Sequence, residues 1–417
     1  MREIIEEKHM NQKMKILGIQ RRAGTWKIYL STIVFFIMIF RPTVLMYNQS
    51  LRFYFNYIQL VGLAMLISLP LIQIIRSRRI SKESAVVLMW NMLILWSTFL
   101  NDLPMGVCVR NTLSMLTIFL YVEWITQISF EKFIKSISFC VYIYAILDVF
   151  AMVTTGLKGL FPEMNIITGT PLYFVNGKFQ NSYLQLFLSM IVVATTEKSK
   201  KIIPRYRRLI LYLFMIVLNI TVTQYVHCTT GTIITLIFWI SYFIPAIRKI
   251  LRSPGRFFIV FAILNFLIVV FQITLKSSFL QFVVLKVLGK QLSLTGRTDI
   301  YSGFLETING QWLFGKGYGN TVIFNMTGSY ANSQNVFLES ILTSGILGTT
   351  CMLYILFKAI NKELLKSSSF IAAAFVAAFI GYFTAGIVEV CFDNWFYLLV
   401  AMAIAYRKKY LVNECVS

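Results

Sequence analysis

The sequence predicts an all-α integral membrane protein, and three observations point to this fold class. Charged residues make up 13% of the 417 residues, against about 25% in soluble globular chains. The mean hydropathy is +0.71, and long apolar segments recur along the chain. Short basic clusters separate these segments, so the formal charge of +22 favours membrane topology over nucleic-acid binding.

About twelve apolar segments are candidate transmembrane helices, because a span needs roughly 20 apolar residues within a range of about 17–25. The last segment is short, and a very tight turn joins the pair around His227. The candidates are residues 26–44, 53–75, 84–101, 105–127, 134–154, 180–196, 209–226, 231–247, 257–275, 335–357, 370–388 and 394–406.

The basic clusters predict the orientation. Placing the N-terminus in the cytoplasm puts most Lys and Arg residues in cytoplasmic segments, as the positive-inside rule expects. Both termini are then cytoplasmic, and the basic segments also contact anionic membrane lipid. The basic residues left on or near the outer face are Arg41, Arg52, Arg110, Lys158, Lys178, Lys276, Lys286, Lys290, Arg297 and Lys316.

This layout divides one membrane domain into three parts. Residues 1–275 form a nine-span region, residues 276–333 a large extracytoplasmic loop, and residues 334–417 a three-span region. The loop and a second outer segment, residues 154–181, exceed the length of about 12–15 residues above which loops are usually functional or disordered. Both are too apolar and aromatic for disorder, which indicates a functional outer surface.

The large loop opens with a mixed apolar and basic stretch, KSSFLQFVVLKVLGKQLSL. This pattern is typical of an amphipathic helix in the outer interface, and it fits a cover packed over the helix bundle equally well. A second helix is expected at TDIYSGFLETI, capped by Thr298 or Asp299 and directly preceded by Arg297. A helix N-terminus and an Arg fork together bind phosphate oxygens. The alternatives for Arg297 are an ion pair with Asp299 or contact with a lipid headgroup.

Three glycines follow, with Lys316 and Tyr318 between them, at Gly315, Gly317 and Gly319. Glycine permits close approach of the backbone to a ligand, although such a run is a weak signal alone.

The tenth span comes next, and Asn332 or Ser333 is expected to cap it. Gln334 and Asn335 are then expected in its first turn. Their amides either bind sugar hydroxyls or complete the helix end.

Arg110 is expected a turn or two below the outer surface. An Arg inside a span costs at least about 2.5–3.5 kcal/mol, so such residues normally face the bundle interior or a cavity. The alternatives are that Arg110 reaches the outer headgroups, or that it forms a structural ion pair with Asp148.

No metal or cofactor is predicted. The two histidines, His9 and His227, lie far apart, and no nucleotide-binding glycine pattern is present. The cysteines lack metal spacing and are interpreted as small buried residues: Cys108, Cys140, Cys228, Cys351, Cys391 and Cys415. Any reaction must therefore draw its energy from the substrate or from an ion gradient.

The run LTGRTDIYSGFLETINGQWLFGKGYGN, followed by SQNVFLESILTSGILG, resembles the signature of the O-antigen ligase and Wzy-type polysaccharide polymerase superfamily. GKFQNS at residues 177–182 is also similar to a segment that precedes a span in this superfamily. The resemblance implies a GT-C-like fold in the bacterial cytoplasmic membrane. It also implies a metal-independent, inverting glycosyl transfer that uses a glycan on undecaprenyl pyrophosphate.

The resemblance further implies roles for particular residues. Arg297 matches a pyrophosphate-binding arginine, and Arg110 is a second candidate by position. The family histidine is replaced by Gln334, which cannot act as a base, so a polymerase fits better than a ligase. The remaining candidates are Asp299, Glu306 and Glu339 for the base, and Lys316, Gly317, Gly319, Gln334, Asn335 and Glu339 for substrate binding.

Two other functions stay open. A ligase would pass a finished glycan to another acceptor. A lipid-linked glycan flippase would show about twelve spans and normally two related halves, but no internal repeat is evident in the sequence. A polymerase would work alongside a flippase and a chain-length regulator.

Overall fold

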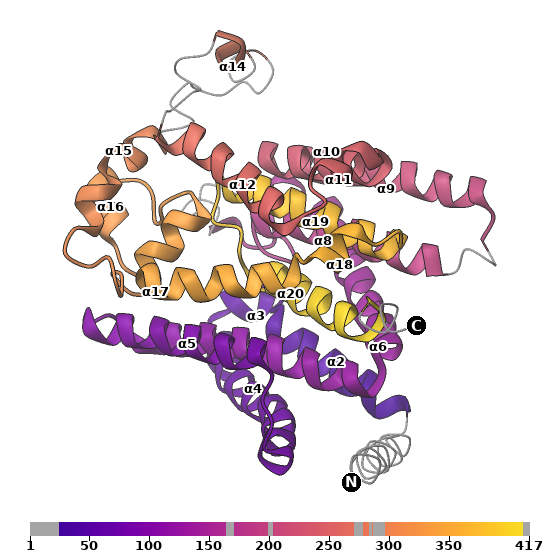
Figure 1. The fold of residues 1–417 in the computed structure, drawn as a ribbon, viewed down its shortest axis with the longest axis horizontal. Coiled ribbons are helices and arrows are strands. Elements are labelled where there is room, and N and C mark those ends of the chain that lie inside the picture. Colours follow the sequence, from indigo (N-terminus) through magenta and orange to yellow (C-terminus); the bar gives the residue numbers. More distant parts are fainter. Residues whose placement is uncertain are drawn as a thin grey trace, which may run out of the picture.

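The computed structural model describes residues 25–163, 171–198, 203–270, 278–282, 286 and 297–411. Within these residues the only β-structure is one isolated bridge between Tyr173 and Asn176, and the helices form a single bundle (Figure 1). The prediction of an all-α protein is therefore confirmed for this part of the chain.

Five described helices are long and apolar enough to cross a membrane, which agrees with the predicted membrane class. The count of twelve spans and the GT-C-like fold remain predictions. The five are α4 (Gln49–Ser77), α5 (Lys82–Leu100), α6 (Met105–Thr155), α9 (Arg205–Tyr225) and α17 (Val336–Ala359). Shorter apolar helices are α2 (Thr25–Ile39), α10 (Thr229–Phe243), α12 (Pro254–Asn265) and α19 (Phe370–Gly386).

Further helices complete the bundle and its connections. They are α3 (Thr43–Tyr47), α8 (Lys178–Lys198), α11 (Pro245–Ile250), α14 (Ser278–Phe282), α15 (Arg297–Ile308), α16 (Val322–Thr327), α18 (Lys362–Lys366) and α20 (Asn394–Tyr406). Short non-α turns are η1 (Gly156–Lys158), η2 (Phe266–Val270) and η4 (Arg407–Leu411). The amphipathic helix expected from Lys276 onward lies mostly outside the described residues.

The 51-residue helix α6 contains one break, at Ser129, where φ is −160° and ψ is 100°. It therefore comprises two helices, which correspond to the expected segments 105–127 and 134–154. The sequence predicts a cytoplasmic loop between them, whereas the structure joins them through one extended residue. With a loop or with a break, the chain reverses direction between the two halves. Arg110 near the start of α6 and Asp148 near its end therefore both lie near the predicted outer end.

Helix α17 is broken at Gly345, where φ is +65° and ψ is −170°. A side chain at this position would overlap the carbonyl group of Leu313. Backbone groups freed by the break are paired with the preceding loop: Ile346 N donates to Trp312 O at 2.8 Å, and Lys316 N donates to Leu342 O at 2.6 Å. Inside a membrane bundle such pairing is what makes a broken helix tolerable.

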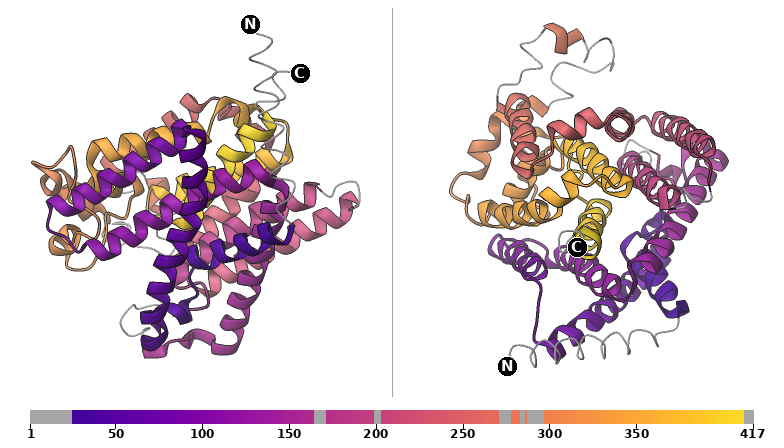
Figure 2. Two further views of the ribbon diagram at one scale, coloured as in Figure 1. Left: turned by 90° about the horizontal axis from the view of Figure 1, so that it is seen from below. Right: turned by 45° about the vertical axis from the view of Figure 1, so that its right-hand side comes forward.

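The C-terminal helices form the core. Most side chains of α19 are buried, and α19 and α20 run through the middle of the bundle in the right-hand view of Figure 2. The sequence of α19, FIAAAFVAAFIGYFTAG, supplies the small residues that allow close helix packing. Much of the α19–α20 connection is also buried, including Ile387, Glu389 and Cys391.

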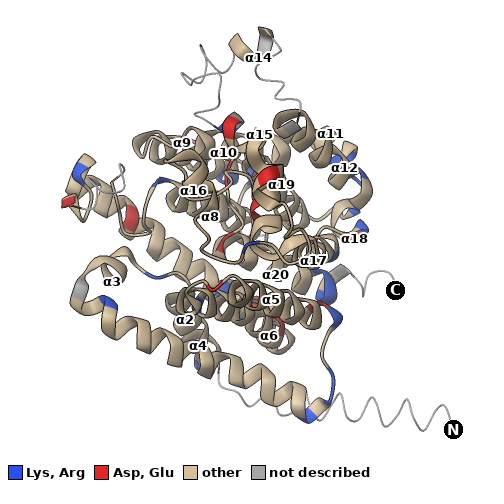
Figure 3. Cartoon of the chain, turned by 90° about the vertical axis from the view of Figure 1, so that its left-hand side faces the viewer, with Lys and Arg blue, Asp and Glu red and all other residues tan. Residues whose placement is uncertain are grey.

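Charged residues concentrate at helix ends and connections, while the helices themselves are largely uncharged (Figure 3). Near the C-terminal end of α20, Arg407 contacts Glu83 at 2.9 Å and Lys408 contacts Glu123 at 2.8 Å. Helices α15 and α16 lie at the opposite end of the bundle, at the left in Figure 1. This is the end that the charge pattern assigns to the outer face.

Candidate functional site

Two cavities adjoin at the end of the bundle assigned to the outer face. One has a volume of about 650 Å³ and is lined by Arg41, so it is named the Arg41 cavity. The other has a volume of about 880 Å³ and is lined by Arg297, so it is named the Arg297 cavity. Residues that line both are Asn176, Gln180, Ala331, Asn332 and Val390. The two cavities therefore share a wall.

Arg297 begins α15 and reaches the α19–α20 connection. Its guanidinium forms an ion pair with Glu389, and its Nη2 also lies 3.4 Å from Gln334 Oε1. The sequence offered Asp299 as an ion-pair partner, but Asp299 is exposed and lies in the first turn of α15. Both members of the Arg297–Glu389 pair are largely buried, so the pair is held in a defined geometry.

Glu389 is a candidate functional residue that the sequence analysis missed. Burial raises its pKa to about 7, although the charges of Arg297 and Lys178 act in the opposite direction. A carboxylate with a pKa near neutrality is suited to accept a proton from a hydroxyl group. The sequence feature that could have identified Glu389 is its position as an acidic residue in the apolar connection GIVEVCFDN, between the last two expected spans.

Gln334 has a constrained backbone geometry. Its φ is +52°, a left-handed value that is uncommon for residues other than glycine. Its Nε2 donates to Asn332 Oδ1 at 2.6 Å, and Tyr301 Oη donates to its carbonyl oxygen at 3.2 Å. These contacts direct the amide oxygen toward Arg297, where it can orient the guanidinium.

Asn335 has a structural role, which agrees with the alternative that its amide completes the helix end. It caps α17, since its Oδ1 accepts from Phe337 N at 3.0 Å and Leu338 N at 3.1 Å. Its Nδ2 donates to Asn265 Oδ1 at 2.7 Å and to Ile387 O at 2.8 Å. The side chain is fully buried. The cap is therefore not Asn332 or Ser333, and Asn335 instead fixes the connection that carries Glu389.

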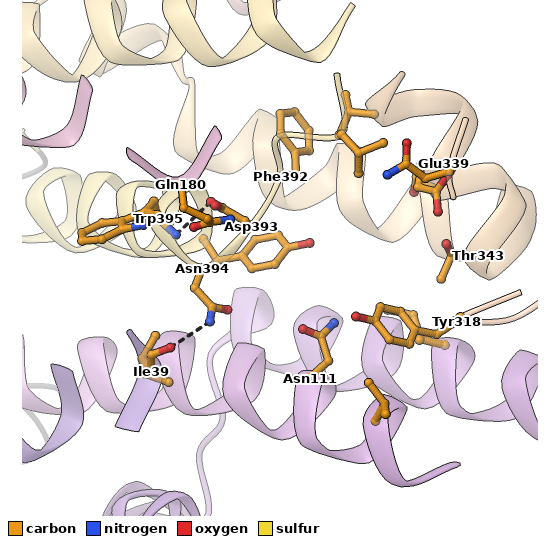
Figure 4. A pocket seen from close by; sticks show the side chains of 18 of the residues that line it. Ile39, Asn111, Gln180, Tyr318, Glu339, Thr343, Phe392, Asp393, Asn394 and Trp395 are labelled. Carbon is orange, nitrogen blue, oxygen red and sulfur yellow. Dashed lines mark hydrogen bonds between the residues drawn. The ribbon is translucent and has the colours of Figure 1, made fainter. Parts of the chain in front are cut away.

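The Arg41 cavity lies between the N-terminal helices and the C-terminal helices (Figure 4). Tyr318 and Asn111 lie on one side, and Glu339 and Thr343 of α17 lie across from them. Asp393 caps α20 by accepting from Trp395 N at 3.0 Å, with Gln180 beside its carboxylate. Amide and aromatic side chains thus surround a basic residue.

Of the three carboxylates expected as bases, the structure brings only Glu339 to a cavity. Glu339 lines the Arg41 cavity and accepts from Ser333 N at 2.9 Å. Asp299 and Glu306 are exposed on α15 and line neither cavity. Sequence spacing alone did not show which face of α15 these two residues occupy.

Arg110 donates from Nη1 to Asn56 Oδ1 at 3.0 Å. The expected alternative pairing with Asp148 is wrong, because Asp148 is fully buried and its Oδ1 accepts from Val175 N at 2.9 Å. Arg110 lines neither cavity, but its positive charge acts on the guanidinium of Arg41.

The glycine run mainly packs against neighbouring helices. Gly317 has a φ of +84°, and a Cβ there would lie 2.8 Å from Thr98 Cα in α5. Tyr318 N donates to Thr98 Oγ1 at 3.0 Å. Neither Gly317 nor Lys316 lines the Arg41 cavity or the Arg297 cavity, whereas Gly319 and Tyr318 line the Arg41 cavity.

In the described residues, no three His, Cys, Asp or Glu side chains gather to hold a metal ion. The described cysteines are buried, as expected, and Cys415 lies outside the described residues. No protein-family model, curated protein or solved structure matches this chain.

Proposed function

We propose that this protein polymerises oligosaccharide repeat units carried on undecaprenyl pyrophosphate, at the outer face of the bacterial cytoplasmic membrane. One observation carries the proposal. Arg297, at the Gly-Arg position of the signature, meets the buried carboxylate of Glu389 in a cavity at the predicted outer end. The proposal includes twelve spans with cytoplasmic termini.

The Arg297–Glu389 pair supplies the two groups that an inverting transfer requires. Arg297 donates hydrogen bonds to the donor pyrophosphate and stabilises the charge that develops as the bond between the sugar C1 and the phosphate oxygen breaks. The hydroxyl oxygen of the acceptor forms the new bond to C1 from the opposite face. Its proton passes to Glu389, so the products are the extended lipid-linked glycan and undecaprenyl pyrophosphate.

Donor binding also frees the base. In the ligand-free structure Glu389 is engaged by Arg297. A pyrophosphate that takes over the guanidinium releases the carboxylate, and its negative charge raises the proton affinity of Glu389 further. Gln334 keeps its role as the side chain that orients Arg297. Proton acceptance by Glu389 accounts for activity without the family histidine.

Deletion of the gene in the source bacterium tests this function. The deletion strain should accumulate single lipid-linked repeat units on the outer face and lack long polymer, and a plasmid copy should restore the polymer. Long lipid-linked polymer that persists without transfer to its final acceptor would instead identify a ligase. Repeat units retained on the cytoplasmic face would identify a flippase.

A further inference from the structure

Arg41 differs from the other partly buried arginines of the bundle. Arg208, Arg297 and Arg407 each contact a glutamate. Among the described residues, Arg41 makes no ion pair and no side-chain hydrogen bond, yet it lines a cavity. A partly buried charge without a partner is unfavourable, so this arginine is arranged for an anionic ligand.

The surroundings of Arg41 increase its positive potential. Arg110 has the largest electrostatic effect on its guanidinium, and Arg52 adds a smaller effect of the same sign, while Tyr318 and Tyr47 act in the opposite direction. The two carboxylates that line the same cavity are engaged elsewhere: Glu339 accepts from Ser333 N, and Asp393 caps α20. Neither carboxylate forms an ion pair with Arg41, so the guanidinium has no directly bound counter-charge among the described residues of the cavity.

The rest of the cavity is suited to a saccharide. Its walls carry several amide side chains that can bind sugar hydroxyls and several aromatic rings on which sugar rings can pack. The amides include Asn111, Gln180 and Asn332, and the aromatic residues include Trp90, Tyr318 and Tyr397. A phosphate-binding group beside such walls selects a sugar attached to phosphate.

We propose that the Arg41 cavity is a second binding site for a lipid-linked saccharide, in which Arg41 holds the pyrophosphate. The inference rests on the proposed function in one respect, since it assigns the acceptor substrate to this cavity and the donor to the Arg297 cavity. The shared wall at Asn176, Gln180, Asn332 and Val390 is where the two saccharides meet. The far end of the acceptor then lies beside the donor C1 and Glu389.

The number of pyrophosphate sites tests this inference without any requirement for activity. The full chain in lipid nanodiscs is titrated with farnesyl pyrophosphate, a short-chain analogue. The unaltered protein should bind two equivalents. Arg41→Gln and Arg297→Gln should each bind one, and Arg41→Lys should bind two with one weakened. Arg76→Gln is the matched control, because Arg76 is exposed, lines neither cavity and is not among the groups that act on Arg41, and it should bind two.

Fewer than two sites in the unaltered protein, or two unchanged sites in Arg41→Gln, would overturn the inference. Arg41→Lys guards against misfolding of the Gln variant, since it keeps the charge. If the protein binds two equivalents of farnesyl pyrophosphate but makes no polymer, the second binding site is supported and the proposed polymerase function is refuted. If the protein makes polymer and Arg41→Gln leaves the KM for the repeat unit unchanged, the polymerase function is supported and the role of Arg41 is refuted.

Discussion

Arg297 and Glu389 are 92 positions apart in the sequence, yet their side chains form an ion pair at the wall of the Arg297 cavity. Arg297 starts α15, a short helix of the large loop, and Glu389 lies in the connection between the core helices α19 and α20. The pair brings together a phosphate-binding cation and a carboxylate with a pKa of about 7.

Arg297→Ala should abolish polymer formation while the protein remains in the membrane, and Arg297→Lys should restore only part of the activity. The reason is that Lys keeps the charge but lacks the two-pronged donor geometry that suits phosphate. Polymer length on gels, normalised to protein abundance, is the measurement. Long polymer from a verified Ala variant would refute the assignment.

Glu389→Gln should lower the transfer rate by roughly 10²–10⁴-fold, the usual contribution of a general base. The carboxyl of Glu389 is protonated below its pKa of about 7 and ionised above it, and only the ionised form accepts a proton. The value of kcat/KM should therefore rise as the pH increases through about 7 and then level off. The groups facing Glu389 that lower this pKa are Arg297 and Lys178. A variant that keeps the same rate and pH profile would exclude Glu389 as the base.

Asn335→Ala should destabilise the protein by about 2 kcal/mol, because it removes a helix cap and leaves two buried acceptors without their donor. Gln334→Ala should slow transfer moderately and leave thermal stability close to normal, since it removes only an orienting contact. Thermal unfolding in detergent, measured beside activity, separates the two variants. Equal stability of both would contradict the structural role of Asn335.

Gly345→Ala should sharply reduce protein abundance, because a Cβ at this φ of +65° overlaps the Leu313 carbonyl group. Gly255→Ala in α12 is the matched control, since a Cβ there meets nothing within 4 Å, and it should be tolerated. Membrane abundance by immunoblot compares the two. A fully abundant Gly345→Ala protein would show that the break in α17 is not required.

The predicted orientation is tested by single cysteines at two exposed positions, Asn325 in α16 and Ser368 before α19. An impermeant thiol reagent on intact cells should label the first and spare the second until the membrane is opened. The reversed pattern would contradict cytoplasmic termini and place both cavities on the other face.

The sequence predicted the helical membrane class, because composition and hydropathy alone determine it. It also singled out Arg297, because that residue sits in a recognisable local pattern. It missed Glu389, because the pairing joins residues far apart in the chain and depends on how α15 docks on the α19–α20 connection. It did not show that Asn335 caps α17 or that Gly317 packs against α5, because polar and glycine residues near a site contact either a ligand or the backbone, and only packing distinguishes the two.

The most direct test of the polymerase is elongation by the purified protein. The substrate is the undecaprenyl-pyrophosphate repeat unit extracted from the deletion strain, supplied with EDTA and without nucleotide, ion gradient or separate acceptor. The account predicts a ladder of longer lipid-linked glycans, which is absent with Arg297→Ala and strongly reduced with Glu389→Gln. A folded, substrate-binding protein that leaves the repeat unit unextended would contradict it.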